Sequence, residues 1–243
     1  MQNNYLHICE KKSKKKKQLA LLIDPDKFHS LEIIDAANKA QVDVLLVGGS
    51  ILTSGNIEET ILKIKKQTTI PVIIFPGNTM QISNKADGIL FLSLISGRNP
   101  ELLIGNHVIA APLLKSSQIE VIPTGYMLIE NGKQTAAAYM SQSLPIPADK
   151  DEIAVCTALA GEMLGLKMIY MDAGSGAKNP ISASMIKAVR KNISVPLIIG
   201  GGIKTAEQAV VACDAGADIV VIGNAFEKDF SLVETISKSI HSF

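Results

Sequence analysis

The sequence predicts an α/β fold of the (β/α)8 barrel class, and three observations support this. The chain has 243 residues, a length that one such barrel commonly fills as a single domain. Short apolar runs without polar alternation recur along it, which is typical of strands buried on both faces of a parallel sheet. Helix-compatible segments separate these runs, and eight alternations in this length match a closed barrel. A doubly wound open sheet is the alternative, but no G-x-G-x-x-G follows the first strand.

The predicted elements alternate through one domain, residues 1–243. Strands are expected at 19–23, 42–47, 71–75, 88–92, 120–129, 167–171, 195–199 and 218–222. Helices are expected at 30–40, 57–67, 100–116, 148–164, 182–191, 205–215 and 225–240. Between the third and fourth strands lies only the segment 76–87, which contains Pro76, Gly77 and Asn78. This segment is too short and too broken for a barrel helix, so we expect an irregular crossover in place of the third helix.

Several element boundaries carry local signals. Pro25 cannot continue a strand ladder, so the first strand should end just before it. Ser30 stands at the start of the first helix, and Pro180 lies near the start of the helix at 182–191. Thr205 opens the segment Thr-Ala-Glu-Gln, which is typical of a capping box at a helix start.

Composition excludes several classes of protein. The chain is 47% hydrophobic with a formal net charge of +1, which excludes wholesale disorder and gives no general attraction to nucleic acid. It contains no Trp, which argues against a stacking platform for single strands. The cysteines, Cys9, Cys156 and Cys213, are odd in number and widely spaced, and no signal-peptide segment is evident. We therefore expect a cytoplasmic protein, with Cys156, Cys213 and the methionines packed in the core.

Residues 1–18 are expected to form an N-terminal helix and a lysine-rich segment. Six lysines crowd this region: Lys11, Lys12, Lys14, Lys15, Lys16 and Lys17. Such a run is typical of a solvated helix end or linker. It is also compatible with a peripheral contact to an anionic membrane surface, worth about 1 kcal/mol per lysine. The sequence leaves both interpretations open.

Polar residues follow the first two predicted strands, where barrel enzymes place their reactive groups. Asp24 ends the first strand, and Gly49 and Ser50 end the second. A carboxylate and a hydroxyl on neighbouring strands suit Mg²⁺, which takes one or two carboxylates plus waters and substrate phosphates. The alternative is that Asp24 only caps the following helix.

Glycine-rich ends of the last three strands predict a phosphate site. These ends are Tyr170–Gly176, Gly200–Ile203 and Gly223–Ala225. Backbone N–H groups at such loops point toward an anion, and each following helix adds the positive end of its dipole. The histidines His7, His29, His107 and His241 lie away from the predicted strand ends except His29, so a hydrolytic triad is disfavoured.

Together these motifs resemble the geranylgeranylglyceryl phosphate synthase family. The resemblance runs from about residue 19 to the last helix and includes the irregular third crossover. Its motifs are Asp-Pro-Asp-Lys at 24–27, Val-Gly-Gly-Ser at 47–50, Ile-Pro-Thr-Gly-Tyr at 122–126, Tyr-Met-Asp-Ala-Gly-Ser-Gly at 170–176, Gly-Gly-Gly-Ile at 200–203 and Gly-Asn at 223–224. The segment 170–176 is the most specific of them.

The resemblance implies a prenyltransferase that joins a prenyl diphosphate to the 3-hydroxyl of sn-glycerol 1-phosphate and releases diphosphate. It implies that Mg²⁺ is held by Asp24 and Ser50. The implied catalytic residues are Asp172, which deprotonates the hydroxyl, and Tyr170. The implied glycerol phosphate pocket consists of Tyr170, Met171, Asp172, Ala173, Gly174, Ser175, Gly176, Gly201, Gly202, Gly223 and Asn224.

Two positions depart from the family pattern. Asp172 stands where the family has Glu, so its carboxylate is one methylene shorter. Leu22 stands where some bacterial relatives carry a lysine that touches the glycerol phosphate, which places this chain nearer the other branch. Geranylgeranyl diphosphate is the donor that this resemblance favours, and longer donors stay open.

A prenyl tail of about twenty carbons requires an apolar groove, because its burial contributes on the order of 10 kcal/mol. We expect Tyr126, Leu128, Phe91 and Leu94 to line it, with ordinary core packing as the alternative for all four. Two other functions stay open: another sugar-phosphate barrel enzyme, such as an isomerase or lyase, and a non-catalytic phosphate- or isoprenoid-binding protein. A symmetric homo-oligomer is also expected, as for most such enzymes.

Overall fold

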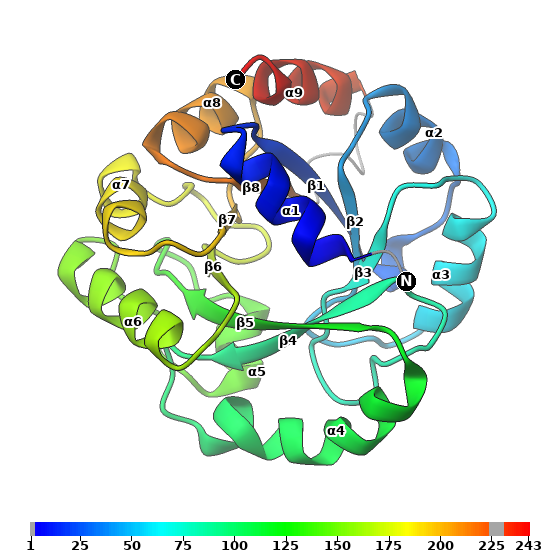
Figure 1. Cartoon of the computed structure of the whole chain (residues 1–243), viewed down its shortest axis with the longest axis horizontal. Helices are drawn as coiled ribbons and strands as arrows, with labels where there is room; N and C mark the ends of the chain where they lie inside the picture. Colours follow the sequence, from blue (N-terminus) through cyan, green and yellow to red (C-terminus); the bar gives the residue numbers. More distant parts are fainter. Residues whose placement is uncertain (1–2, 224–230) are drawn as a thin grey trace.

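The computed structural model describes residues 3–223 and 231–243. Within them, eight parallel strands close into a barrel in chain order, with β8 pairing to β1. Figure 1 shows the helices arranged as a ring around the strands. The strands are β1 (Gln18–Ile23), β2 (Val44–Val47), β3 (Val72–Ile74), β4 (Gly88–Leu94), β5 (Glu120–Leu128), β6 (Met168–Asp172), β7 (Leu197–Gly200) and β8 (Ile219–Ile222). The predicted (β/α)8 barrel is confirmed.

The outer helices follow the strands at the predicted places. They are α2 (Glu32–Lys39), α3 (Ile57–Lys65), α4 (Asn106–Ser117), α6 (Asp151–Met163), α7 (Ala183–Asn192), α8 (Ala206–Ala215) and α9 (Ser231–His241). A 3-10 turn, η1 (Pro25–Lys27), follows β1, and a π-helical turn, η2 (Glu101–Gly105), leads into α4. The predicted start of the last helix, 225–230, lies outside the described residues. Sequence reasoning missed the short helix α5 (Ala136–Ser141), which lies between β5 and α6.

The predicted helix-start signals act locally as hydrogen-bond partners. The Thr205 hydroxyl accepts a bond from the Gln208 N–H at the start of α8, at 3.3 Å. The Ser30 hydroxyl accepts a bond from the Glu32 N–H at 3.1 Å, one residue before the cap of α2. Ser182, two residues after Pro180, caps α7 through the Met185 N–H at 3.2 Å.

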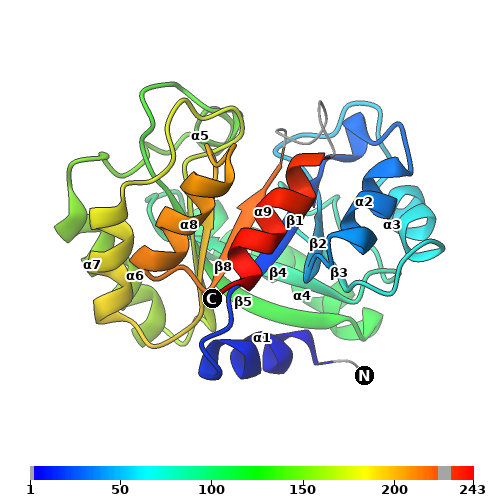
Figure 2. The same cartoon turned by 90° about the horizontal axis from the view of Figure 1, so that it is seen from above.

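Helix α1 (Asn4–Ser13) closes the amino-terminal end of the barrel (Figure 2). Its Ile8 is buried against the side chains that fill the barrel interior. The Glu120 carboxylate, at the start of β5, accepts bonds from the N–H groups of Asn4 and Tyr5 at 2.6 and 3.0 Å. The lysine run begins in the last turn of α1, where Lys11 pairs with Asp43. The run therefore lies at the end of the barrel opposite the strand carboxyl ends.

The third crossover contains no helix, as predicted, and it leaves the barrel wall incomplete. Strand β3 has three residues and pairs with β4 only through Ile73–Gly88 and Ile74–Ile89. Strand β4 pairs with β5 over all seven of its residues, from Gly88 to Leu94. The carboxyl-terminal half of β4 therefore lacks a β3 partner. No helix lies between β3 and β4.

Side chains alternate between the barrel interior and the layer beneath the helices. Along β1, Leu19 and Leu21 pack under the helices, while Ala20 points inward. The expectation that the methionines and Cys156 are core residues is wrong in part. Met80 is 88% exposed, and Cys156 is exposed on α6, because each lies on the solvent side of its segment. Cys213 is buried, and burial raises the pKa of its thiol to about 12.

Among the described residues, every helix is too short or too polar to cross a bilayer.

Candidate active site

Asp172 is a buried carboxylate at the carboxyl end of β6, with 7% of its surface exposed. Its Oδ2 accepts a bond from the Tyr126 hydroxyl at 2.5 Å, and its Oδ1 accepts one from the Gly174 N–H at 2.7 Å. Burial raises the pKa of Asp172 above its usual range, while these two hydrogen bonds act in the opposite direction. A carboxylate with a raised pKa at a barrel mouth has the properties of a general base.

Three aromatic rings form a cluster, one of which contacts this carboxylate. Tyr126 of β5, Tyr170 of β6 and Phe75 after β3 contact one another, with ring centroids 5.2 to 5.7 Å apart. Burial raises the pKa of both tyrosines well above the usual range, and the charge of Asp172 adds to the effect. The Tyr126 hydroxyl therefore stays protonated and stays a donor to Asp172.

The glycine loops after β6 and β7 meet at the mouth beside Asp172. A Cβ added to Gly201 would lie 2.6 Å from the Gly174 nitrogen and 2.8 Å from Asp172 Oδ1. Gly201 and Gly202 have φ values of +80° and +74°, which side chains strongly disfavour. Glycine is therefore required here, both for the turn and for the approach of the two loops. Such loops offer backbone N–H groups to an anion.

The other predicted members of the phosphate pocket lie on the same loops. Tyr170 is 1% exposed, and its hydroxyl lies against Gly200, where an added Cβ would be 2.5 Å away. Met171 and Ala173 are buried, whereas Ser175 and Gly176 are exposed at the loop surface. Gly223 directly follows β8 and lies beside the Leu22 side chain. The predicted contact Asn224 lies outside the described residues.

Asp24 lies at the end of β1 and close to the loop after β2. Its Oδ1 accepts a bond from the Asp26 N–H at 3.1 Å, so it caps the 3-10 turn η1 as the alternative interpretation expected. Its Oδ2 lies 3.4 Å from Lys27 Nζ. A Cβ added to Gly49 would be 3.3 Å from Asp24 Oδ1, and Ser50 follows directly. The structure therefore brings the two predicted metal-binding segments together.

The loop after β2, which carries Ser50, is held by the Asp26 carboxylate in the loop after β1. Asp26 accepts bonds from the N–H groups of Thr53, Ser54 and Gly55 at 2.8, 3.0 and 2.5 Å. These three bonds lower the pKa of Asp26 well below its usual range. Asp26 therefore orders the loop after β2 while it stays ionised.

Gln81 ties the same loop to the third crossover. Its side chain is buried, with 1% of the residue exposed. The Gln81 Oε1 accepts bonds from the Gly49 and Gly77 N–H groups at 3.3 and 3.1 Å, and Nε2 donates to the Gly49 carbonyl at 2.7 Å. Sequence reasoning missed Gln81, because it lies inside an irregular segment where no strand-end rule applies.

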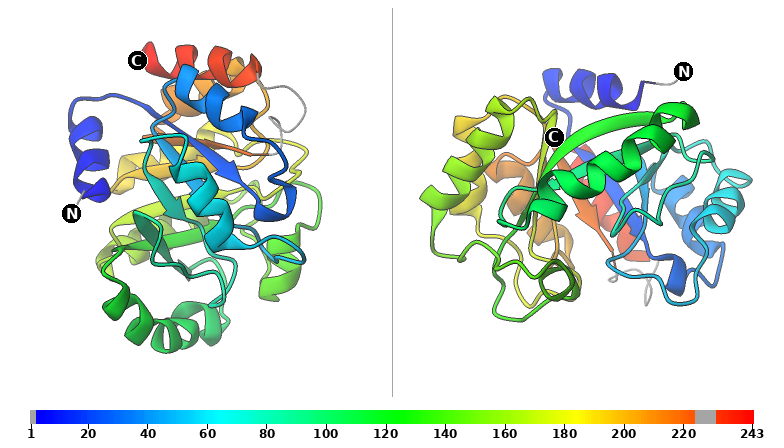
Figure 3. Two further views of the ribbon diagram at one scale, coloured as in Figure 1. Left: turned by 90° about the vertical axis from the view of Figure 1, so that its right-hand side faces the viewer. Right: turned by 90° about the horizontal axis from the view of Figure 1, so that it is seen from below.

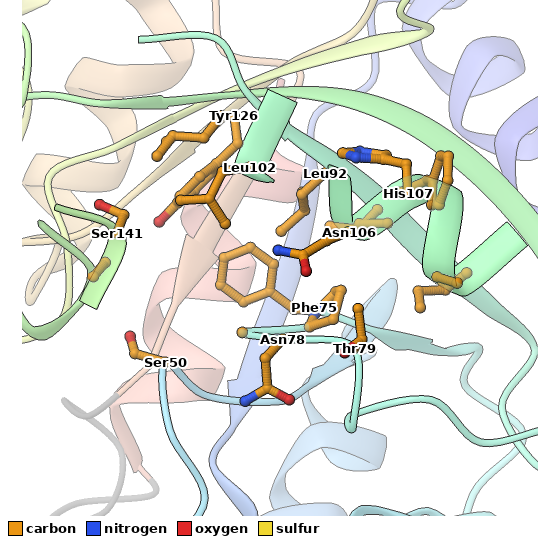
Figure 4. A pocket seen from close by; sticks show the side chains of 18 of the residues that line it. Ser50, Phe75, Asn78, Thr79, Leu92, Leu102, Asn106, His107, Tyr126 and Ser141 are labelled. Carbon is orange, nitrogen blue, oxygen red and sulfur yellow. The ribbon is translucent and has the colours of Figure 1, made fainter. Parts of the chain in front are cut away.

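A cavity of about 330 Å³ opens beside Ser50 and passes between β3 and β4 toward α4 (Figure 4). Most of its wall is apolar. The four residues expected to line a prenyl groove all line it: Phe91, Leu94, Tyr126 and Leu128. The cavity occupies the place where β4 lacks a β3 neighbour. It exists because no helix lies between β3 and β4.

Several cavity residues were not found from the sequence. Asn106 and His107 of α4 and Phe75 line the cavity, and so do Met140 and Ser141 of α5. Phe75 ends the third predicted strand, so the strand-end rule applied there would have found it.

His107 lies on α4, away from the strand ends as predicted, but it lines the cavity. It is 8% exposed, its Nε2 lies 3.2 Å from Ser93 Oγ, and its ring meets Phe91 edge-on at 4.4 Å. Burial lowers the pKa of His107, so the ring is neutral at pH 7. His107 reaches the cavity because no helix lies between β3 and β4, so α4 faces the cavity directly.

Comparison with known proteins identifies the family of this barrel. The PcrB family model matches residues 11–241. Geranylgeranylglyceryl phosphate synthase of Chitinophaga pinensis is 50% identical over 241 residues, which cover 98% of this chain and 96% of the relative. The relative of the same name from Spirosoma linguale is 50% identical over 94% of this chain and 93% of its own length.

A solved structure gives the same result. The crystal structure of (S)-3-O-geranylgeranylglyceryl phosphate synthase from Thermoplasma acidophilum, in complex with its substrate sn-glycerol-1-phosphate, matches with a TM-score of 0.92. The two chains are 31% identical, and the match covers 100% of each. The chain therefore belongs to the PcrB family, together with these geranylgeranylglyceryl phosphate synthases.

Proposed function

We propose that this chain is a Mg²⁺-dependent prenyltransferase that joins geranylgeranyl diphosphate, or a related prenyl diphosphate, to the 3-hydroxyl of sn-glycerol 1-phosphate. The reaction releases diphosphate and forms an ether-lipid precursor. Family membership supports this reaction. The observation that carries it is the apolar cavity that connects the Ser50 loop to Tyr126, whose hydroxyl binds the buried Asp172. A sugar-phosphate isomerase has no use for such a cavity.

The acceptor binds at the loops after β6, β7 and β8. The glycine loops at 174–176 and 201–202 hold the phosphate, with Gly223 beside them. The Ala173 and Gly174 N–H groups donate to the Gly200 carbonyl and to Asp172, so they shape the loop. Asp172 then lies beside the bound glycerol and accepts the proton of the 3-hydroxyl as the new C–O bond forms. The hydrogen bonds from Tyr126 and Gly174 hold the shorter side chain of Asp172 in position.

The donor binds with its tail in the 330 Å³ cavity and its diphosphate toward Asp24 and Ser50. The cavity excludes water from the allylic carbon, which becomes cation-like as diphosphate departs, and so protects it from hydrolysis. Tyr126 lies at the junction, because its ring lines the cavity and its hydroxyl holds Asp172. This one side chain aligns the donor with the base.

The residues at Asp24 fit a magnesium ion. The site offers the Asp24 carboxylate next to Gly49, which precedes Ser50, and the described residues contain no cluster of three His, Cys, Asp or Glu side chains that would hold a metal by themselves. This donor set suits Mg²⁺, which keeps waters and binds substrate phosphates. When bound, Mg²⁺ supplies positive charge to the departing diphosphate.

We place the reaction in the cytoplasm, because Cys9, Cys156 and Cys213 are all free thiols. We further propose that the chain is one domain over residues 1–243 and that it forms a symmetric homo-oligomer.

A turnover assay tests the proposed reaction. Labelled sn-glycerol 1-phosphate, geranylgeranyl diphosphate and Mg²⁺ are mixed with the protein, with sn-glycerol 3-phosphate and EDTA as controls. Product from the 1-phosphate alone, and only with Mg²⁺, supports the proposal. No product with any prenyl donor, despite measurable binding of glycerol phosphate, contradicts it.

Substitution of Asp24 tests the metal site. We expect Asp24→Ala to lower turnover by about a hundredfold or more, because the departing diphosphate loses its metal-stabilised environment. Thermal unfolding should change little, since Asp24 caps only a three-residue turn. The measurement is turnover against Mg²⁺ concentration, and full activity at ordinary Mg²⁺ would place the metal elsewhere.

A further inference from the structure

Asn131 is a buried polar residue in an otherwise exposed stretch of the chain. It lies between β5 and α5, where its neighbours Glu130 and Gly132 are exposed, yet only 7% of Asn131 is exposed. Figures 2 and 3 show this segment beside the loop after β6, at the end of the barrel opposite α1. The Asn131 side chain points away from solvent, toward the loop that follows Asp172.

The Asn131 amide binds the peptide group that joins Ala173 to Gly174. Its Nδ2 donates a hydrogen bond to the Ala173 carbonyl. The N–H of the same peptide group belongs to Gly174, and it donates to Asp172 Oδ1 at 2.7 Å. Because a peptide group is planar and its carbonyl and N–H point in opposite directions, a bond that fixes the carbonyl also aims the N–H. Asn131 therefore acts on Asp172 through one rigid unit.

Without this bond, the peptide group between Ala173 and Gly174 would have a second orientation. Gly174 has a φ of +86°, as in the third residue of a type II turn. Rotation of the central peptide group of such a turn by about 180° gives a type I turn, and glycine adopts both at little steric cost. In the rotated form the carbonyl would face Asp172 in place of the N–H. Asn131 stabilises the orientation in which the carboxylate has a donor.

The oxygen of the same amide indicates that the position requires a donor. Asn131 Oδ1 is buried and has no hydrogen-bond partner among the described residues. A buried acceptor without a partner is unfavourable. A leucine of similar size would avoid this penalty, but it could not bind the Ala173 carbonyl. The contribution of the amide therefore lies in its N–H group.

We propose that Asn131 is a positioning residue for the general base, because it holds the peptide group after Ala173 so that the Gly174 N–H points at Asp172. This inference rests on the proposed function, in which Asp172 accepts the proton of the acceptor hydroxyl. The Gly174 N–H and the Tyr126 hydroxyl each bind one oxygen of this carboxylate. Together they fix the rotation of the carboxylate relative to the bound acceptor.

In the part of the chain that the structure describes, the titratable side chains that face Asp172 are Tyr126 on β5 and Tyr170 on β6. Burial holds the pKa of both tyrosines well above the usual range, so both stay protonated. The loop after β7 approaches Asp172 with Gly201, which carries no titratable group. A change in the pKa of Asp172 on substitution of Asn131 therefore reports on the Gly174 N–H.

Carboxyl-carbon NMR of protein with labelled aspartate side chains measures the pKa of Asp172 directly. The signal that is lost in Asp172→Asn identifies this carboxylate. Asn131→Leu removes the donor and keeps the size of the side chain, and Asn131→Ala removes the same donor without adding apolar volume. Gln134→Leu, at an exposed position of the same segment, is the matched control.

We expect the pKa of Asp172 to rise by about one pH unit in both Asn131 variants, the size of one hydrogen bond to a charged group. The pKa should stay in place in Gln134→Leu. An unchanged pKa in the folded Asn131 variants overturns the proposal, and so does an equal rise in the Gln134 control.

Turnover separates a positioning role from a structural one. Asn131→Leu should lower kcat about tenfold, a part of what one base contributes, and should raise the pH below which kcat/KM falls. In the Asp172→Asn background the same substitution should have little further effect, because the carboxylate on which it acts is already absent. An equal loss of rate in both backgrounds would show a structural role alone and would overturn the proposal.

The two measurements distinguish this inference from the proposed function, because the NMR titration needs no substrate. A wild type that is inactive with every prenyl donor contradicts the proposed function, and with it the role of Asn131 in placing a base. A wild type that is active, with an unchanged pKa of Asp172 in the Asn131 variants, contradicts this inference alone.

Discussion

At the residue scale, the proposed chemistry depends on how Asp172 is held. Its two oxygens accept bonds from different elements, one from Tyr126 on β5 and one from the Gly174 N–H in the loop after β6. Burial makes the carboxylate a stronger base, and these bonds limit the cost of keeping it ionised. The same contacts therefore fix the position of the side chain and act on its pKa.

Asp172→Asn should lower kcat by about a hundredfold to ten-thousandfold, the range that one acid–base group contributes. The amide has nearly the same shape but cannot accept the proton of the acceptor hydroxyl. Asp172→Glu is the matched control, and it should retain far more activity because a carboxylate remains. Steady-state kinetics with sn-glycerol 1-phosphate measure both variants, and a near wild-type rate for Asp172→Asn would move the base to another group.

Tyr126→Phe should move the acidic limb of the pH–rate profile to higher pH. The Tyr126 hydroxyl stabilises the ionised form of Asp172, so its loss raises the pKa of that carboxyl further. Protonated Asp172 cannot act as a base. When the pH is lowered, the rate of the variant therefore begins to fall at a higher pH than the rate of the wild type. The measurement is kcat/KM against pH. Tyr170→Phe is the control, because no bond joins its hydroxyl to Asp172, and its acidic limb should stay in place.

At the scale of elements, the crossover between β3 and β4 has the largest influence on function. It replaces a helix by a segment without regular structure, which opens the wall beside β4 and creates the cavity. The same segment supplies Gln81, which binds the loop that carries Ser50. One irregular crossover therefore shapes the proposed donor site and orders the loop of the predicted metal site.

Gln81→Ala should weaken both the fold and the response to Mg²⁺. It leaves the Gly49 and Gly77 N–H groups and the Gly49 carbonyl without their buried partner, at a cost of about 1–3 kcal/mol. Because the Ser50 loop is then less ordered, the Mg²⁺ concentration for half-maximal turnover should rise as well. The exposed Asn84, in the same segment, provides the control variant Asn84→Ala. A lowered melting temperature with an unchanged Mg²⁺ dependence would show that Gln81 has a purely structural role.

At the scale of the whole molecule, the two ends of the barrel have different tasks. The carboxyl end holds Asp172, the glycine loops and the cavity. The amino end is covered by α1, whose first N–H groups bind Glu120. In barrels of this kind the carboxyl end serves chemistry and the amino end serves stability.

Glu120→Ala should therefore lower stability by about 1 kcal/mol, comparable to the loss of a helix cap, and leave kcat unchanged. The N–H groups of Asn4 and Tyr5 lose their acceptor. Helix α1, whose Ile8 packs against the barrel interior, is then held less firmly. Urea unfolding followed by far-UV circular dichroism measures the first effect, and turnover measures the second. Glu120→Gln, which keeps an acceptor oxygen, should be closer to the wild type. Reduced turnover without reduced stability would contradict this division between the two ends.

Much of the fold and part of the candidate site were predictable from the sequence. The buried strands appear as continuous apolar runs, because both faces of a parallel strand meet other side chains. That Asp24, Ser50 and the glycine loops lie at one end of the barrel was predictable, because parallel strand order alone brings the carboxyl ends together. The missing third helix was also predictable, since the segment 76–87 has neither the length nor the residues for one.

The tertiary structure alone decided which side chains meet across the barrel. The bond between Tyr126 and Asp172 joins residues 46 positions apart, and Gln81 reaches Gly49 across 32. His107 lines the cavity only because α4 faces an open wall. Local sequence records the propensity and the burial of each segment, but such contacts depend on strand register and on the close packing of neighbours. They exist only once the barrel has closed.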